Sequence, residues 1–192
     1  MLWPIVLPFK ITCWILAGFV AAVILVSPLF KWKLGKAVLI STFIALLAFI
    51  PICAGVGSII DSKRFGVFHY ATYAEVQDFR VERYLPPQAR DITLDKFAMG
   101  HRARYSITLD ELTEYLDALW IESDGRSAVP RAKIDDGKLT PSKYFEDRFD
   151  GLGWAMPETA VEFHSPVQSD GGGANYFFDA KTNTVFQHAG YW

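Results

Sequence analysis

Four histidines are the side chains best suited to bind a metal ion or transfer a proton, and they lie far apart in the chain. None of His69, His101, His164 and His188 has a second histidine beside it or four residues away, so the local spacing of zinc sites is absent. His101 lies on the apolar side of an alternating stretch, which favours a hydrogen-bonded core histidine over a metal ligand. The sequence predicts no metal site and no cofactor.

A second group has the residue types of a hydrolase: His164, Ser165 and Asp170. Adjacent residues on an extended chain point to opposite sides, so His164 and Ser165 are poorly placed as base and nucleophile. The glycines at 171–173 resemble a phosphate loop only in composition, since such a loop needs a helix after it, and here a strand is expected. We expect a loop between strands and no recognisable catalytic site.

Aromatic side chains crowd the last third of the chain. Strand alternation directs Tyr176 and Phe178 to one face and Phe177 to the other. If one face is core, the other either contacts a partner or is covered by a helix, and both arrangements are open. The candidate interaction residues are Trp154, Tyr176, Phe177, Phe178, Phe186, Tyr191 and Trp192.

The elements that position these residues have local signals. Thr108 and Glu111 form a capping box, and leucines at helical spacing follow, which predicts a helix from 108 that ends before Gly125. Residues 174–179 and 184–188 predict a hairpin. Period-two alternation over 93–107 predicts one strand, or a hairpin if Gly100 marks a turn.

Weaker signals complete this region. Thr72 and Glu75 suggest another capping box and a short helix through Phe79, although a strand over 79–85 also fits. Thr140 and Pro141 predict a short helix over 140–149, and 160–163 reads as a strand. Helices and strands do not alternate regularly, so residues 61–192 are expected to form a small soluble α+β domain with a mainly antiparallel sheet.

Residues 1–60 have a different character. Residues 11–30 and 37–60 are two uncharged apolar runs, each long enough to cross a bilayer as a helix. A cleavable signal peptide fits the first run poorly, because the run is long and a second follows at once. The expected fold is two transmembrane helices in a hairpin, followed by the α+β domain. Pro51 is expected to kink the second helix.

The lysines set the expected orientation. The link between the runs carries Lys31, Lys33 and Lys36, whereas Lys10 alone precedes them. The positive-inside rule places this link in the cytoplasm and both termini outside, by a small margin. We expect an integral protein of a bacterial inner membrane whose soluble domain is periplasmic, and an inverted hairpin would place that domain in the cytoplasm.

Small residues mark expected helix contacts: Gly18 and Ala22 on the first span, Ala48 and Gly55 on the second. Whether they contact each other or a partner's helices is open. Cys13 and Cys53 lie at similar depth, and each is expected to be a small apolar residue in a helix. Whether they pair is also open.

Charge restricts the partners. All 21 acidic residues lie from Asp61 onward with 15 basic ones, so residues 61–192 carry a net charge of −6. An acidic domain argues against nucleic acid or anionic lipid as its partner, and the partners expected of the whole chain are the membrane bilayer and other membrane-protein subunits.

A pattern over residues 81–192 resembles a known type of domain. Leu-Pro-Pro-x-Ala-x-x-Ile at 85–92, an alternating strand, a capped helix and Tyr-Phe-x-Asp at 176–179 resemble small uncharacterised bacterial membrane-anchored or lipoprotein-like domains. The resemblance implies a fold and no activity. The function expected is that of an accessory or assembly subunit of a larger membrane complex. The alternatives are a cell-envelope enzyme with scattered catalytic residues, which predicts histidines and carboxylates converging in one pocket, or a solute- or glycan-sensing domain, which predicts an exposed aromatic cleft.

Overall fold

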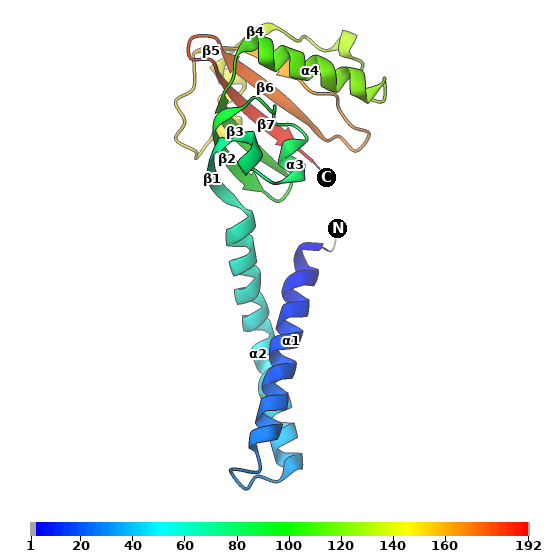
Figure 1. Cartoon of the computed structure of the whole chain (residues 1–192), viewed down its shortest axis with the longest axis vertical. Helices are drawn as coiled ribbons and strands as arrows, with labels where there is room; N and C mark the ends of the chain where they lie inside the picture. Colours follow the sequence, from blue (N-terminus) through cyan, green and yellow to red (C-terminus); the bar gives the residue numbers. More distant parts are fainter. Residues whose placement is uncertain (1–2, 192) are drawn as a thin grey trace. The chain divides into compact units, whose positions relative to one another are not determined.

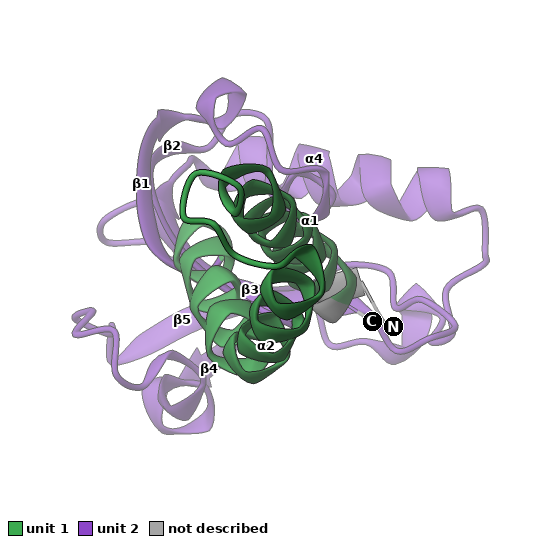
Figure 2. Cartoon of the chain, turned by 90° about the horizontal axis from the view of Figure 1, so that it is seen from below, with its two compact units in different colours: residues 1–64 green, residues 65–192 purple. Residues whose placement is uncertain are grey.

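The structure, a computed structural model, describes residues 3–191. The chain divides into two compact units, residues 1–64 and 65–192 (Figure 2). The sequence placed this division after Ile60, four residues before the end of the first unit.

The first unit is a hairpin of two long apolar helices, α1 (Trp3–Val26) and α2 (Leu34–Arg64) (Figure 1). Both are long and apolar enough to cross a membrane, by length and composition alone. α1 ends before the expected boundary because Pro28 lacks the N–H that would continue the helix. α2 continues one turn past Ile60, where Lys63 and Arg64 complement the negative end of the helix dipole.

Small and hydroxylated side chains form the contact between the two helices together with Leu16 and the ring pair Phe9 and Phe49. Thr12 and Leu16 are buried on α1, and Ala37, Ser41 and Ala45 are buried on α2. Each set recurs every four residues, which places it on one face of its helix. The two helices therefore pack along a narrow face, and most of their apolar surface lies outside this contact.

The second unit is built on one antiparallel sheet of seven strands in the order β1-β2-β3-β7-β6-β5-β4. Its strands are β1 (Gly66–Thr72), β2 (Arg90–Phe97), β3 (Gly100–Ser106), β4 (Lys138–Pro141), β5 (Thr159–His164), β6 (Gly173–Asp179) and β7 (Thr184–Gly190). The last strand in sequence, β7, is the central strand of the sheet.

Residues 93–107 form a hairpin instead of one strand, with Ala98 and Met99 in the turn. Gly100 begins β3 in close contact with the adjacent strand, and a Cβ there would overlap the carbonyl oxygen of Ala189. Glycine is therefore required by the approach of two backbones.

Helix α4 (Leu109–Ser123) covers one face of the sheet (Figure 1). Both halves of the expected capping box are present, with Glu111 N–H donating to Thr108 and the Glu111 carboxylate accepting from the Thr108 N–H. Leu112 and Leu116 are fully buried, and they join the core formed by the inward side chains of β2, β3, β6 and β7. Local capping and the leucine spacing together explain this element.

The opposite face of the sheet carries a smaller core. Phe145 and Phe149 pack on Phe177 and Phe186, with stacked rings 4.3 Å apart for Phe145 and Phe177. The helix expected over 140–149 is instead β4 followed by two 3-10 turns, Ser142–Tyr144 and Glu146–Phe149.

Between β1 and β2, two very short helical elements take the place of the single helix expected through Phe79. They are a 3-10 turn, Tyr73–Glu75, and the four-residue α3 (Phe79–Glu82). At the first of these, Glu75 accepts hydrogen bonds from the Ala71 N–H and the Thr72 hydroxyl, so neither half of a capping box is formed.

Candidate functional site

The aromatic side chains proposed as an interface lie mostly inside the domain. Tyr176 and Phe178 are buried in the core under α4, and Phe177 and Phe186 are buried in the second core. Residues 145–156 cover that second face, so of the two arrangements weighed, the covered one is present, although 3-10 turns and loop residues take the place of a helix. Trp154 and Tyr191 are half-buried, and Trp192 lies outside the described residues.

The small residues proposed for helix packing differ in their exposure on the hairpin. Gly18, Ala22 and Gly55 are exposed on the hairpin, and Ala48 is half-buried. A Cβ at Gly18 or Gly55 would meet no atom within 4 Å. Cys13 and Cys53 are free thiols.

A cleft of about 620 Å³ lies beside α4 in the sheet domain. Its walls come from three separate segments: the end of α3 with the residues after it, α4 with the residues that follow it, and the loop before β6. The lining residues are Glu82, Arg83, Tyr84, Tyr115, Leu119, Glu122, Ser123, Arg126, Ser127, Pro166, Val167, Gln168 and Ser169. The charged members are balanced, two acids against two arginines, so the cleft has aromatic, hydroxyl and amide groups without a dominant charge.

Hydrogen bonds hold the walls of this cleft together. The Tyr115 hydroxyl on α4 donates to the Arg83 carbonyl oxygen at 3.2 Å. On the other side, the Val167 N–H donates to the Ser127 hydroxyl at 3.0 Å, and the Ala128 N–H donates to the Val167 carbonyl oxygen at 2.7 Å. The cleft is thus preformed.

Tyr84 supplies the most buried polar group of the lining. Its hydroxyl is buried beside the Gln168 side chain and makes no hydrogen bond of good geometry among the described residues. Burial raises the pKa of this hydroxyl above its ordinary value, and the Asp170 carboxylate adds to the rise. The hydroxyl is therefore a neutral donor enclosed behind the wall of the cleft.

Behind Tyr84 lies a buried polar cluster. The Tyr84 carbonyl oxygen accepts from the Tyr176 hydroxyl at 2.7 Å and from the Gln187 amide at 2.8 Å. His101 is fully buried next to Gln187, and burial lowers its pKa to about 3. Three buried polar atoms here have no hydrogen-bond partner among the described residues: His101 Nδ1, Gln187 Oε1 and the Tyr105 hydroxyl oxygen. The cluster fixes the backbone of Tyr84 from below.

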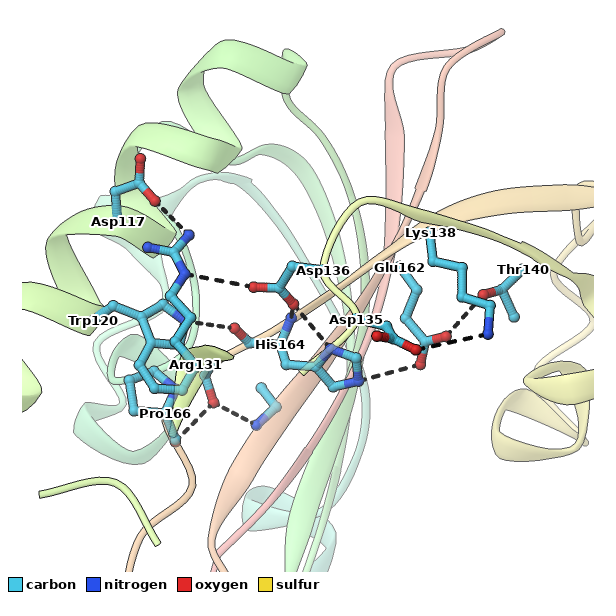
Figure 3. A network of polar contacts seen from close by, with 12 residues as sticks. Asp117, Trp120, Arg131, Asp135, Asp136, Lys138, Thr140, Glu162, His164 and Pro166 are labelled. Atoms are coloured by element: carbon cyan, nitrogen blue, oxygen red, sulfur yellow. Dashed lines mark hydrogen bonds and ion pairs between the residues drawn. The ribbon is translucent and has the colours of Figure 1, made fainter. Parts of the chain in front are cut away.

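On the sheet face that carries the second core, His164 lies between two carboxylates (Figure 3). Its Nδ1 is 3.0 Å from Asp136 Oδ1 and its Nε2 is 3.4 Å from Glu162 Oε1. The Thr140 hydroxyl donates to the other oxygen of Glu162, and Arg131 pairs with Asp136. Each ring nitrogen faces a carboxylate, so the network joins the 124–137 loop to β4 and β5.

The three candidate hydrolase residues, His164, Ser165 and Asp170, do not form a catalytic arrangement. Ser165 is buried, its hydroxyl accepts from the Ala174 N–H at 2.8 Å, and it donates to the Pro166 carbonyl oxygen at 3.2 Å. Asp170 instead accepts from the Gly172 N–H within the loop. The serine hydroxyl therefore stabilises the chain where it enters β6.

The remaining histidines lie apart from the cleft. His69 on β1 is 3.1 Å from the Thr93 hydroxyl, and the His188 ring lies beside Phe97. Burial lowers the pKa of His188, helped by Arg148 and Arg102. Within residues 3–191, no three His, Cys, Asp or Glu side chains are placed to hold a metal ion.

A row of polar side chains crosses the sheet on the face of the second core, and the sequence analysis missed it. Cross-strand register aligns Asp95, Arg102, His188, Asn175 and His164 on five neighbouring strands. Register was the only possible signal, since the row joins strands that are distant in sequence.

Arg102 makes the most side-chain hydrogen bonds of the residues in this row. It binds Asp95 Oδ2 through two nitrogens, at 2.9 and 2.6 Å, and donates to the carbonyl oxygens of Arg148 and Asp150. This side chain attaches the segment that covers the second core to the sheet.

Comparison of the chain with protein-family models, curated proteins and solved structures finds no match. Function is therefore inferred from the contacts themselves.

Proposed function

We propose that this protein is a membrane-anchored accessory subunit of a larger membrane assembly. In this proposal α1 and α2 cross a bacterial inner membrane, the basic link at 31–36 is cytoplasmic, and the sheet domain is periplasmic. Helix length, apolar composition and the lysines of the link support this placement.

The observation that carries the proposal is the position of the small residues on the hairpin. α1 and α2 contact each other through Thr12, Leu16 and the alanine side of α2, whereas Gly18, Ala22 and Gly55 lie outside that contact. Small residues on a lipid-facing helix surface let another helix approach closely. These positions are accordingly free to pack on the helices of other subunits.

The test is the native mass and partner list of the tagged chain, extracted in mild detergent from its own membrane. We expect a stoichiometric larger assembly with wild-type protein and its loss with Gly18→Leu or Gly55→Leu, because the new side chain separates the helices. Leu39→Ile is the matched control, since Leu39 is exposed on α2 and its size is unchanged.

Three results would count against this function. One is a wild-type chain that runs as a lone monomer or homodimer, and another is an assembly that keeps its composition in both glycine variants. The third is turnover of an envelope substrate by the purified monomer, which would favour the enzyme alternative.

A second candidate function, solute binding, is favoured by the cleft beside α4. A preformed volume of about 620 Å³ lined by aromatic, hydroxyl and amide groups suits a small polar ligand with an apolar face, such as a saccharide or short peptide. A ligand that binds only the folded state raises the melting temperature.

Thermal unfolding of the full chain in detergent, with a panel of mono- and disaccharides and dipeptides, tests this candidate. We expect one class to raise the melting temperature of wild-type protein and to have no effect on Leu119→Trp, which fills the cleft. Asp110→Asn, on the exposed first turn of α4 and outside the lining, is the control that should keep the response. Absence of any shift across the panel removes this candidate.

A further inference from the structure

The exposed apolar side chains of the sheet domain include a connected group around α3 and the β2–β3 turn. Phe79 is 78% exposed and Met99 is 44% exposed. The Arg80 guanidinium lies 5.9 Å from the ring centres of both Phe79 and Tyr191, and the Tyr191 N–H donates to the Met99 carbonyl oxygen at 3.0 Å. We name Phe79, Arg80, Met99 and Tyr191 the basal patch.

Strand register places this patch at the end of the sheet that the hairpin joins. Gly66, the first residue of β1, pairs with Lys96, close to the β2–β3 turn. At the same end, Gly100 pairs with Gly190, the residue before Tyr191. α2 ends at Arg64 and β1 begins at Gly66, so a single residue separates the anchor from this end of the sheet.

The length of chain leading to β1 is short compared with the lipid headgroup layer. The uncharged part of α2 ends at Ile60. From there the six residues to Gly66 span about 9 Å at helical rise. The headgroup region adds roughly 5–7 Å to each side of the hydrocarbon core. Neighbouring strands are about 4.8 Å apart, which puts the start of β3 only about 10 Å to the side of Gly66.

Charge at this end also suits a membrane surface. Arg80 is at the centre of the basal patch, and Lys63 lies in the last turn of α2. The nearby carboxylate of Asp78 is already paired with Lys96 at 3.1 Å. Exposed aromatic and apolar side chains beside a cation match the bilayer interface, which is apolar on one side and carries phosphate on the other.

We propose that the basal patch docks on the lipid surface, with Phe79 and Met99 at the headgroup–acyl boundary and Arg80 facing lipid phosphate. The proposal rests on the membrane anchoring in the proposed function. It adds that the sheet domain is held against the bilayer and is not free to swing on its linker. Burial of these side chains in the interface removes apolar surface from water, which favours the docked state.

Spin-label accessibility in single-chain lipid discs of phosphatidylcholine and phosphatidylglycerol tests this contact. Labels are placed one at a time by Phe79→Cys, Met99→Cys, Tyr144→Cys and Leu39→Cys in a chain carrying Cys13→Ala and Cys53→Ala. Tyr144 is the matched control, because it is 65% exposed and follows β4 at the opposite end of the sheet. Leu39, 71% exposed on α2, reports on the anchor.

We expect collisions with a water-soluble nickel chelate at positions 79 and 99 to be several-fold fewer than at 144, with oxygen collisions increased. Equal nickel accessibility at 79, 99 and 144, with position 39 shielded by lipid, overturns the docking and leaves the anchor intact. Nickel access at position 39 overturns the anchoring and the docking together. Because each disc holds one chain and no other protein, shielding at 79 and 99 identifies lipid as the contact.

Discussion

The side-chain amide of Gln187 donates a hydrogen bond to the imidazole of His101, with 3.2 Å between the two Nε2 atoms. The same amide nitrogen donates to the Tyr84 carbonyl oxygen, so it cannot act as an acceptor. His101 Nε2 must then be unprotonated, and the imidazole is neutral with its proton on Nδ1. A protonated ring would lose this bond inside the core.

This arrangement makes the domain sensitive to acid. The pKa of His101 is about 3 in the folded chain, against 6.5 as its ordinary value. Between these values the unfolded chain binds a proton that the folded chain does not, so stability falls as pH drops below 6.5. We expect a slope of up to about 1.4 kcal/mol per pH unit from this group. His101→Gln should reduce the slope between pH 6 and 4, measured by denaturant unfolding in detergent with tryptophan fluorescence.

The matched control is His69→Gln, which changes an exposed histidine on β1. This variant should keep the wild-type slope. An unchanged slope in His101→Gln would show that His101 does not govern the acid response.

Removing the guanidinium group of Arg102 should weaken the attachment of the segment that covers the second core. Arg102→Lys keeps the charge but cannot reach Asp95 and the carbonyl oxygens of Arg148 and Asp150 together. We expect a loss of about 1.5–3 kcal/mol in the free energy of unfolding, and faster proteolysis within 145–156. Arg104→Lys, on the same strand and exposed, should have little effect, and similar losses in both variants would contradict this role.

Substitution of Phe177 tests whether this side chain belongs to the core of the domain or to an interface with a partner. Phe177→Ala should lower the free energy of unfolding by about 3–5 kcal/mol, because it empties the centre of the second core. Tyr144→Ala, next to the covering segment and exposed, should stay within about 0.5 kcal/mol of wild type. A stable Phe177→Ala protein with lost partners would instead indicate an interface.

Gly100 tests the contact between β3 and β7. Gly100→Ala places a methyl group against the Ala189 carbonyl oxygen, so the two strands must separate and the melting temperature should fall sharply. Its pairing partner offers the control, since a Cβ at Gly190 meets no atom within 4 Å and Gly190→Ala should be tolerated. Equal melting temperatures for the two variants would show that the strands can adjust.

The elements that sequence analysis located are those with local causes. Thr108 and Glu111 lie three residues apart and determine the start of α4 by themselves. The strands around Phe177 follow from alternation between neighbours in sequence.

The errors arose from contacts distant in sequence. A helix was expected over 140–149 from Pro141, but Phe145 and Phe149 both reach Phe177, and the backbone at Phe145 leaves the helical region with φ −136°. The cleft likewise joins Tyr84, Tyr115 and Val167 from three segments, and no short pattern links them. Tertiary packing decided each of these features.

The place of β7 in the sheet governs how the domain can form during synthesis. The strands β1, β2 and β3 pair among themselves, as do β4, β5 and β6, and β7 alone connects the two groups. A ribosome that has not yet released residues 184–190 therefore leaves two half-sheets, each with a free edge and uncovered apolar side chains. Until its final strand is inserted, the nascent domain therefore exposes strand edges and apolar surface of the kind that favours aggregation.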